Sequence, residues 1–160
     1  RLESGGWVAR TEPVEVEEAA HEAWEPYMEE AARRDIELTL DVDLFIQADY
    51  QGLVQIFKNL LENALRHTPD GGHVHVAGRR DEEGRAVVEV SDDGEGIPSR
   101  ALPRIFERFY RADTSRARDM GGTGLGLAIV RHLVNAMGGE VEAESELGRG
   151  TTIRFTIPGG

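Results

Sequence analysis

The stretch Gly121-Gly122-Thr123-Gly124-Leu125-Gly126-Leu127 leads directly into apolar residues at helical spacing: Leu127, Val130, Leu133, Val134 and Met137. Glycines let the backbone approach an anion closely and adopt positive φ, and the N–H groups at the start of the next helix attract negative charge. The pattern therefore predicts a phosphate-binding loop. A plain turn or helix cap has the same pattern, so the neighbouring motifs must decide between the two.

Length and composition limit the possibilities. With 160 residues and an ordinary apolar content, the chain suits one globular domain with its own core. No apolar run approaches the roughly 20 residues that cross a bilayer, and residues 1–6 do not resemble a secretion signal, so we expect a soluble domain. The lack of cysteine excludes disulfides and thiolate metal sites and fits a reducing compartment.

The formal net charge of −12 argues against general nucleic-acid binding, because a phosphate backbone requires a field of the opposite sign. A nucleotide is still compatible with this charge. A divalent cation and a few well-placed donors can offset the charge of the protein locally.

Apolar spacing predicts the order of elements. We expect a helix over 14–34, a strand over 36–42, a helix over 50–66 capped by Asp49, paired strands at 73–78 and 86–90, a long loop over 92–123, a helix from 127, and strands at 140–144 and 151–157. This order favours an α+β fold, a two-layer sandwich with helices packed on one face of a mixed sheet. A loop as long as 92–123 inside a compact domain is usually functional.

Asn59 and Asn63 are four residues apart on the helix predicted over 50–66, so their amides project from one face. An Asn carbonyl oxygen is a neutral ligand suited to Mg²⁺, and its NH₂ group can donate to phosphate. Arg66 and His67 add a cation and an imidazole near the same place. The alternative is a solvated polar face, with His67 acting only on the dipole of the helix C-terminus.

Asp92 follows a predicted strand and precedes a glycine-rich turn, within Ser91-Asp92-Asp93-Gly94-Glu95-Gly96-Ile97-Pro98. A carboxylate in an apolar slot can accept a hydrogen bond from an exocyclic amine. Such a contact selects adenine, because a base without that donor leaves the carboxylate without a partner. A simple turn or a calcium loop is the alternative.

Five ordered motifs make the pattern specific. They are Asn59-Leu-Leu-Glu-Asn63-Ala-Leu-Arg66-His67-Thr-Pro, Asp92-Asp-Gly94-Glu-Gly96-Ile97, Ile105-Phe-Glu-Arg-Phe109-Tyr-Arg111, Gly122-Thr-Gly124-Leu-Gly126-Leu and Gly148-Arg-Gly150-Thr151. They resemble the asparagine box, first glycine box, phenylalanine box, second glycine box and final Gly-x-Gly-Thr of sensor histidine kinases. The resemblance covers about Val14 to Pro158, the catalytic and ATP-binding domain.

The resemblance implies the Bergerat-type fold of the gyrase, heat-shock chaperone and mismatch-repair ATPases, with a long ATP lid. It implies binding of ATP with Mg²⁺ and transfer of the γ-phosphate to a His on a separate dimerisation domain, for relay to an aspartate of a response regulator. An anti-sigma-type serine kinase and a non-catalytic nucleotide-sensing module are the alternatives. The phenylalanine box and the lid length count against the serine kinase.

The resemblance implies that Asn63 is the Mg²⁺ ligand. It implies that Asn59, beside it, contacts the metal and the phosphates. Arg66 stands where the family usually has Lys, which keeps the charge but alters the donor geometry. Arg111 would be a mobile, catalytic γ-phosphate contact, with Asn59 as the other catalytic residue. The expected phosphate loop comprises Gly122, Thr123, Gly124, Leu125 and Gly126.

For the base, the resemblance makes Asp92 the partner of the adenine amino group and places His67 near the nucleotide. The other residues expected in or near the base pocket are Gly94, Gly96, Ile97 and Thr151. Residues 112–121 would form the lid, with Phe106 and Phe109 packing at its base. A hydrophobic cluster that only pins a loop is the simpler interpretation of these two aromatic residues, and both can hold together.

Two features of the family are missing. Hydrolysing relatives carry a Glu four residues before the metal-binding Asn, where this chain has Asn59, so we expect poor hydrolysis. The sequence around His21 lacks the rest of the acceptor motif, so we expect no phosphoacceptor His in this chain. Residues 1–13 resemble the end of the dimerisation domain and its linker, and 14–160 the catalytic domain. A monomeric cytoplasmic fragment of a bacterial sensor kinase is therefore expected, without direct membrane or nucleic-acid contact.

Overall fold

A computed structural model describes residues 8–107 and 126–158 of the chain. The strands are β1 (Glu12–Glu15), β2 (Glu37–Asp41), β3 (Phe45–Ala48), β4 (His73–Arg80), β5 (Ala86–Asp92), β6 (Val141–Glu146) and β7 (Gly150–Ile157). The helices are α1 (Val16–Trp24), α2 (Met28–Arg33), α3 (Tyr50–His67) and α5 (Gly126–Ala136), with short 3₁₀ turns η1 (Glu25–Tyr27) and η2 (Leu102–Arg104).

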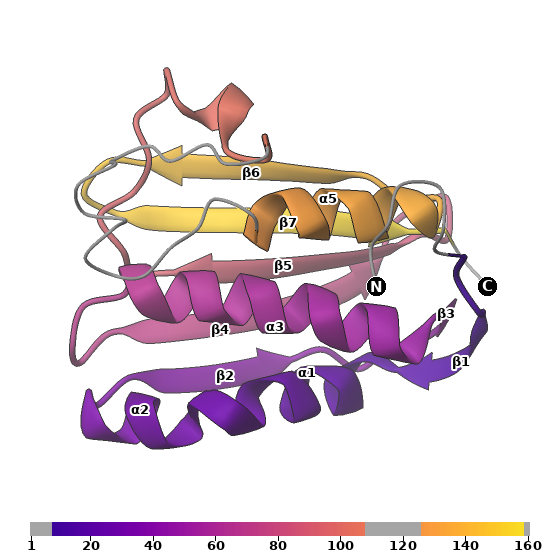
Figure 1. Ribbon diagram of the computed structural model, residues 1–160, viewed down its shortest axis with the longest axis horizontal. Coiled ribbons are helices and arrows are strands. Elements are labelled where there is room, and N and C mark those ends of the chain that lie inside the picture. The colour runs from indigo at the N-terminus through magenta and orange to yellow at the C-terminus, as the bar shows by residue number, and fades with distance from the viewer. Residues whose placement is uncertain (1–7, 108–125, 159–160) are drawn as a thin grey trace.

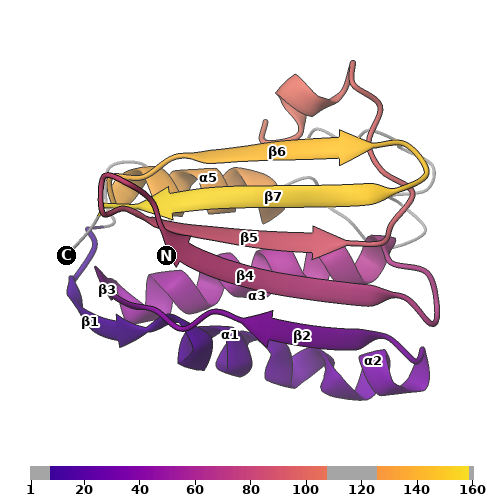
Figure 2. The same ribbon diagram turned by 180° about the vertical axis from the view of Figure 1, so that it is seen from behind.

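Five of these strands form one sheet in the order β2-β4-β5-β7-β6, and β1 pairs with β3 in a separate ribbon. Strands β2 and β4 are parallel, and the other neighbours in the sheet are antiparallel. Helices α1, α3 and α5 lie side by side on one face of the sheet (Figure 1), and Figure 2 shows the strands in front of them from the opposite side. The predicted α+β sandwich with a mixed sheet is confirmed.

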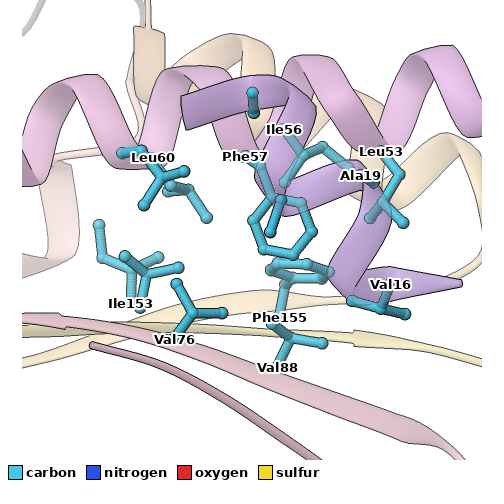
Figure 3. Packing of buried hydrophobic residues seen from close by; sticks show 14 of the residues in the cluster. Val16, Ala19, Leu53, Ile56, Phe57, Leu60, Val76, Val88, Ile153 and Phe155 are labelled. Atoms are coloured by element: carbon cyan, nitrogen blue, oxygen red, sulfur yellow. The ribbon is translucent and has the colours of Figure 1, made fainter. Parts of the chain in front are cut away.

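The core lies between α3 and the middle of the sheet. The rings of Phe57 on α3 and Phe155 on β7 meet edge to face, with their centroids 5.8 Å apart. Leu53, Ile56 and Leu60 share the buried face of α3, and Figure 3 shows them pointing toward the strands. Because each fully buried aliphatic or aromatic side chain contributes about 1.5–3 kcal/mol, this face fixes α3 firmly over the sheet.

Helix α3 begins where the sequence predicts. Asp49 Oδ1 accepts a hydrogen bond from the Gly52 N–H at 2.8 Å, which confirms the predicted cap. The other carboxylate oxygen, Oδ2, accepts from the Arg10 N–H at 2.8 Å. One side chain therefore ties the start of α3 to the chain that precedes β1.

The continuous helix predicted over 14–34 is wrong. Its N-terminal end is strand β1, in which Val14 pairs with Ile46 of β3. Its middle is the 3₁₀ turn η1, which contains Pro26. Proline lacks the N–H that a helix interior needs, so the helix is divided into α1 and α2. Strand β3 was not predicted, because its four residues are too few to show a clear period.

Candidate functional site

The polar face of α3 carries the two predicted asparagines, whose side chains are both half-buried. Gln55 Nε2 donates to Asn59 Oδ1 at 3.2 Å, and Asn59 Nδ2 donates to the Gly126 carbonyl at 3.4 Å. The second hydrogen bond is long, but it joins this face to the first residue of α5. The structure thus brings together two motifs that are 67 positions apart in sequence.

Asp92 is the last residue of β5, and its carboxylate is held by backbone donors. The Gly94 N–H donates to Asp92 Oδ1 at 2.7 Å, and the backbone of Thr151 also hydrogen-bonds to this carboxylate. Burial raises the pKa of Asp92 from its usual 3.8 to about 6, although these two hydrogen bonds lower it. An ionised carboxylate has about four acceptor sites, so Asp92 retains capacity for a further donor.

The turn after Asp92 lies directly against the end of α3. A Cβ atom at Gly94 would lie 2.7 Å from the carbonyl oxygen of His67, closer than side chains approach in proteins. Only glycine allows this contact. It places the Asp92 turn beside the C-terminal end of the helix that carries Asn59 and Asn63, so the first two predicted motifs meet.

The β6–β7 hairpin packs against the same turn from the other side. The Ser145 Oγ accepts from the Ile97 N–H at 2.7 Å and donates to the Gly150 carbonyl at 2.9 Å. Gly96 has a φ of +84°, and a Cβ there would lie 2.4 Å from the Glu146 carbonyl oxygen. The predicted residues Asp92, Gly94, Gly96, Ile97 and Thr151 are therefore brought together. Sequence reasoning missed Ser145, which only its register with Thr151 reveals.

Arg66 and His67 end α3 in different surroundings. Arg66 Nη2 lies 3.8 Å from Glu62 Oε2, and the Glu62 carboxylate also hydrogen-bonds to Tyr27. Burial is the main cause of the raised pKa of Tyr27, and the neighbouring Glu62 adds to it. The predicted phosphate contact Arg66 is thus paired with an acidic residue of its own helix, whereas His67 is exposed beside the Asp92 turn.

Phe106 follows η2 and is 8% exposed, and it packs with Ile105 in the hydrophobic core cluster. The expected role of Phe106 in anchoring a loop fits this burial. Several predicted residues lie outside the described residues: Phe109, Arg111, Gly122, Thr123, Gly124, Leu125 and the lid at 112–121. Gly126 is the one member of the predicted phosphate loop within the described part of the chain, at the start of α5.

A metal site built only from protein ligands is not found among residues 8–107 and 126–158, where no group of three or more His, Cys, Asp or Glu can hold an ion. Mg²⁺ is commonly bound through one or two protein oxygens together with substrate phosphates. The amide of Asn63 forms no hydrogen bond within the described residues, so its oxygen fits such a ligand. The donor set is compatible with a metal that arrives with a nucleotide.

The profile of the "Histidine kinase-, DNA gyrase B-, and HSP90-like ATPase" family matches residues 48–160, which include α3, the Asp92 turn and α5. The chain belongs to this ATPase family. The resemblance stated from the five motifs is confirmed, because the match covers all of them. The family match extends over most of the sheet but begins after α1, α2 and β2.

Sensor histidine kinases are prominent among the similar proteins of this ATPase family. The sensor histidine kinase WalK of Bacillus subtilis is 44% identical over 119 residues, which is 74% of this chain and 20% of WalK. The structure of the mycobacterial sensor histidine kinase MprB has a TM-score of 0.80 and 33% identity, covering 94% of this chain and 98% of that one. The structure of full-length ShkA in complex with AMPPNP has a TM-score of 0.83 and 33% identity, covering 98% of this chain and 32% of ShkA.

The chain spans only a fifth to a third of the length of the curated relatives, from 19% of the Staphylococcus saprophyticus WalK to 34% of a Pseudomonas aeruginosa relative. At the level of the domain, it is similar to the ATP-binding catalytic domains of sensor histidine kinases over nearly its full length. No helix in the described part of the chain has the length and apolar character needed to span a membrane.

Proposed function

We propose that this chain binds ATP with Mg²⁺ and transfers the γ-phosphate to a His on a separate dimerisation domain, for relay to an aspartate of a response regulator. The observation that carries the proposal is the meeting of three motifs at the C-terminal end of α3. The turn that holds the Asp92 carboxylate borders that end, and Asn59 on the same helix hydrogen-bonds to Gly126 at the start of α5. An adenine partner and a phosphate site are thereby brought next to each other.

Asp92 is suited to recognise the adenine amino group. Its carboxylate is partly buried, which raises its pKa to about 6, and it is oriented by the N–H of Gly94. A buried acceptor strongly favours a ligand that supplies the missing donor. Guanine carries a carbonyl oxygen at the equivalent position, so we expect GTP to bind much more weakly than ATP.

Asn63 and Asn59 are suited to the metal and phosphates. Mg²⁺ supplies neutralisation of charge on the transferring group, and the amide oxygen of Asn63 would hold it. Asn59 is already fixed between Gln55 and the Gly126 carbonyl, so its position requires little further ordering. An amide cannot accept a proton from water, which favours transfer to an imidazole over hydrolysis.

Calorimetric titration with ATP, with and without Mg²⁺, tests the binding half of the proposal. We expect Asn63→Ala to remove the Mg²⁺ dependence of the affinity. Asn135→Ala is the matched control, because Asn135 is an exposed amide on α5, and it is expected to behave as the parent chain. Equal Mg²⁺ dependence in Asn63→Ala would contradict the metal role of Asn63.

Transfer is tested by adding a separately prepared dimerisation domain and γ-labelled ATP. A phosphohistidine is labile in acid and stable in base, so acid-labile label on that domain is the expected result. Acid-stable label on a serine of a partner would instead favour the anti-sigma-type serine kinase. Tight binding with no transfer to any acceptor domain would favour the nucleotide-sensing module.

We also propose that the chain works as the cytosolic part of a bacterial sensor kinase and is monomeric when isolated. The sequence similarity to sensor kinases over 74% of the chain supports the first part. Light scattering over a range of concentrations tests the second, and a mass that doubles with concentration would contradict it.

A further inference from the structure

Arg34 directly follows α2, and its side chain reaches across to the end of α3. Its Nη1 donates to the Leu65 carbonyl at 2.9 Å, and its Nη2 donates to the Thr68 carbonyl. The side chain is only 22% exposed. Neither the five motifs nor the family match includes Arg34, since the match begins at residue 48.

These contacts satisfy carbonyl groups that a helix leaves without partners. The last four carbonyls of a helix have no intrahelical donor. In α3, the Ala64 carbonyl is satisfied by the N–H and the hydroxyl of Thr68. The Leu65 carbonyl instead accepts a hydrogen bond from Arg34. A positive group is also favoured at this end of the helix by the helix dipole. Arg34 therefore fixes both the final turn of α3 and the residue that follows it.

The backbone reinforces the same connection. The Gly71 N–H donates to the Arg34 carbonyl at 2.9 Å, and the Glu37 N–H donates to the Gly72 carbonyl at 3.2 Å. Asp35 adopts a φ of +59°, which turns the chain from α2 into β2. The ion pair between Arg34 Nε and Asp70 is 2.7 Å long, but Asp70 is 76% exposed, so this pair contributes little. The hydrogen bonds to the carbonyls are the important ones.

The residues between Leu65 and Thr68 are those that border the Asp92 turn. The carbonyl oxygen of His67 lies 2.7 Å from the position that a Cβ of Gly94 would take, and the Gly94 N–H donates to the Asp92 carboxylate. A shift of the helix end therefore moves Gly94, and with it the carboxylate. Recognition of a base by one acceptor depends on its position to within a fraction of an ångström.

We infer that Arg34 is a positioning residue for base recognition: by holding the Leu65 and Thr68 carbonyls it sets the place of the Asp92 carboxylate in the nucleotide site. The inference rests on the proposed function, because it assumes that Asp92 contacts adenine. It makes the α2–β2 junction a determinant of nucleotide selectivity, although this junction contributes no residue to the site.

The test compares ATP and GTP affinities of Arg34→Ala and Arg34→Lys with those of the parent chain, by calorimetry at a temperature where circular dichroism shows all of them folded. We expect ATP to bind about tenfold more weakly and GTP to be unaffected, so that selectivity falls. Lysine keeps the charge but has no planar fork to reach two carbonyls, so Arg34→Lys is expected to lose selectivity too. Arg33→Ala and Asp70→Asn are the controls, since Arg33 is an exposed neighbour and Asp70→Asn removes only the ion pair with Asp70, leaving the one with Glu30.

A lower melting temperature with unchanged ATP-over-GTP selectivity would overturn the inference, because Arg34 would then only stabilise the fold. Selectivity retained in Arg34→Lys would also overturn it, since charge alone would suffice. A parent chain that binds no ATP would overturn the proposed function and the inference together. A parent chain that binds ATP while the Arg34 variants match it would overturn the inference alone.

Discussion

Strand β5 carries two carboxylates three residues apart, and they have opposite surroundings. Glu89 lies within an ionic cluster, with Arg154 Nε 2.7 Å from its Oε2 and the same guanidinium bound to Glu142 and Glu144. Asp92 forms no ion pair within the described residues, and only backbone N–H groups hold it. The pairing raises the pKa of Arg154 above its usual range, whereas burial raises that of Asp92 to about 6.

The contrast distinguishes a carboxylate that is neutralised by a cation of the protein from one that is not. A carboxylate that is paired with a guanidinium has its negative charge neutralised within the protein. A carboxylate that is buried without a cation is destabilised as an anion and gains most from an added donor. This difference supports the proposal that Asp92 binds a ligand, whereas Glu89 stabilises the sheet.

The largest expected effect comes from Asp92→Ala, which removes the proposed adenine partner. We expect ATP affinity to fall about 10- to 100-fold, because a hydrogen bond to a charged group contributes about 1.5–3 kcal/mol. Glu89→Gln on the same strand is the matched control and is expected to leave affinity unchanged. Calorimetric titration of both variants checks this. Equal losses of ATP affinity in the two variants would contradict a special role for Asp92.

The second effect is a pH dependence of selectivity. Because the pKa of Asp92 is about 6, the carboxylate is mostly protonated at pH 5 and mostly ionised at pH 7. We expect the ratio of ATP to GTP affinity to rise about tenfold over this range, since only the ionised group has its full acceptor capacity. ATP and GTP carry the same triphosphate, so its protonation changes both affinities equally and does not change their ratio. A ratio that stays flat in the parent chain would contradict the prediction.

A third effect concerns stability. The folded chain holds the Asp92 proton more tightly than the unfolded chain does, because the pKa rises from 3.8 to about 6. Stability therefore falls as pH increases through this window. We expect Asp92→Asn to raise the free energy of unfolding by about 1–2 kcal/mol at pH 8, after allowance for partial exposure, and by nothing at pH 4. Urea denaturation at the two pH values measures this, and a gain at pH 4 as large as at pH 8 would count against it.

The smallest effect is expected for Arg154→Ala. This change removes the cation that Glu89, Glu142 and Glu144 share, but Arg79 Nη1 remains 3.9 Å from Glu89 Oε2, and the other two carboxylates are mostly exposed. We expect the free energy of unfolding to fall by about 1 kcal/mol at pH 7, as measured by urea denaturation. ATP affinity should remain that of the parent chain. A tenfold change in affinity would show that the ionic cluster and the Asp92 turn are coupled.

The sequence predicted the parts of this fold that depend on local patterns. Asp49 and the apolar face of α3 followed from spacing and cap chemistry, and both are confirmed. The sandwich and the family followed from the element order and the five motifs. The division of the first helix at η1 was missed, although Pro26 marks it, because the alanines on either side continue the same apolar period.

The site was less predictable, because several of its contacts join distant segments. Ser145 and Arg34 belong to no motif, and their partners lie 48 and 31 positions away in the chain. A single sequence has no signal for such contacts, which arise only when strand register and helix packing are set. Asp92 was predictable because a carboxylate before two glycines is a local pattern, although its raised pKa was not.

The pairing of β5 with β7 has a consequence for how the chain folds. Ala86 pairs with Ile157, so the middle of the sheet joins segments about 70 residues apart, and β7 lies between β5 and β6. Pairing over such separations slows folding, because the intervening chain must be closed into a loop first. The sheet is completed only after residues 150–157 have been synthesised. Gly150 and Thr151 of β7 also contact Asp92, so the surroundings of the Asp92 carboxylate are complete only when β7 has paired with β5.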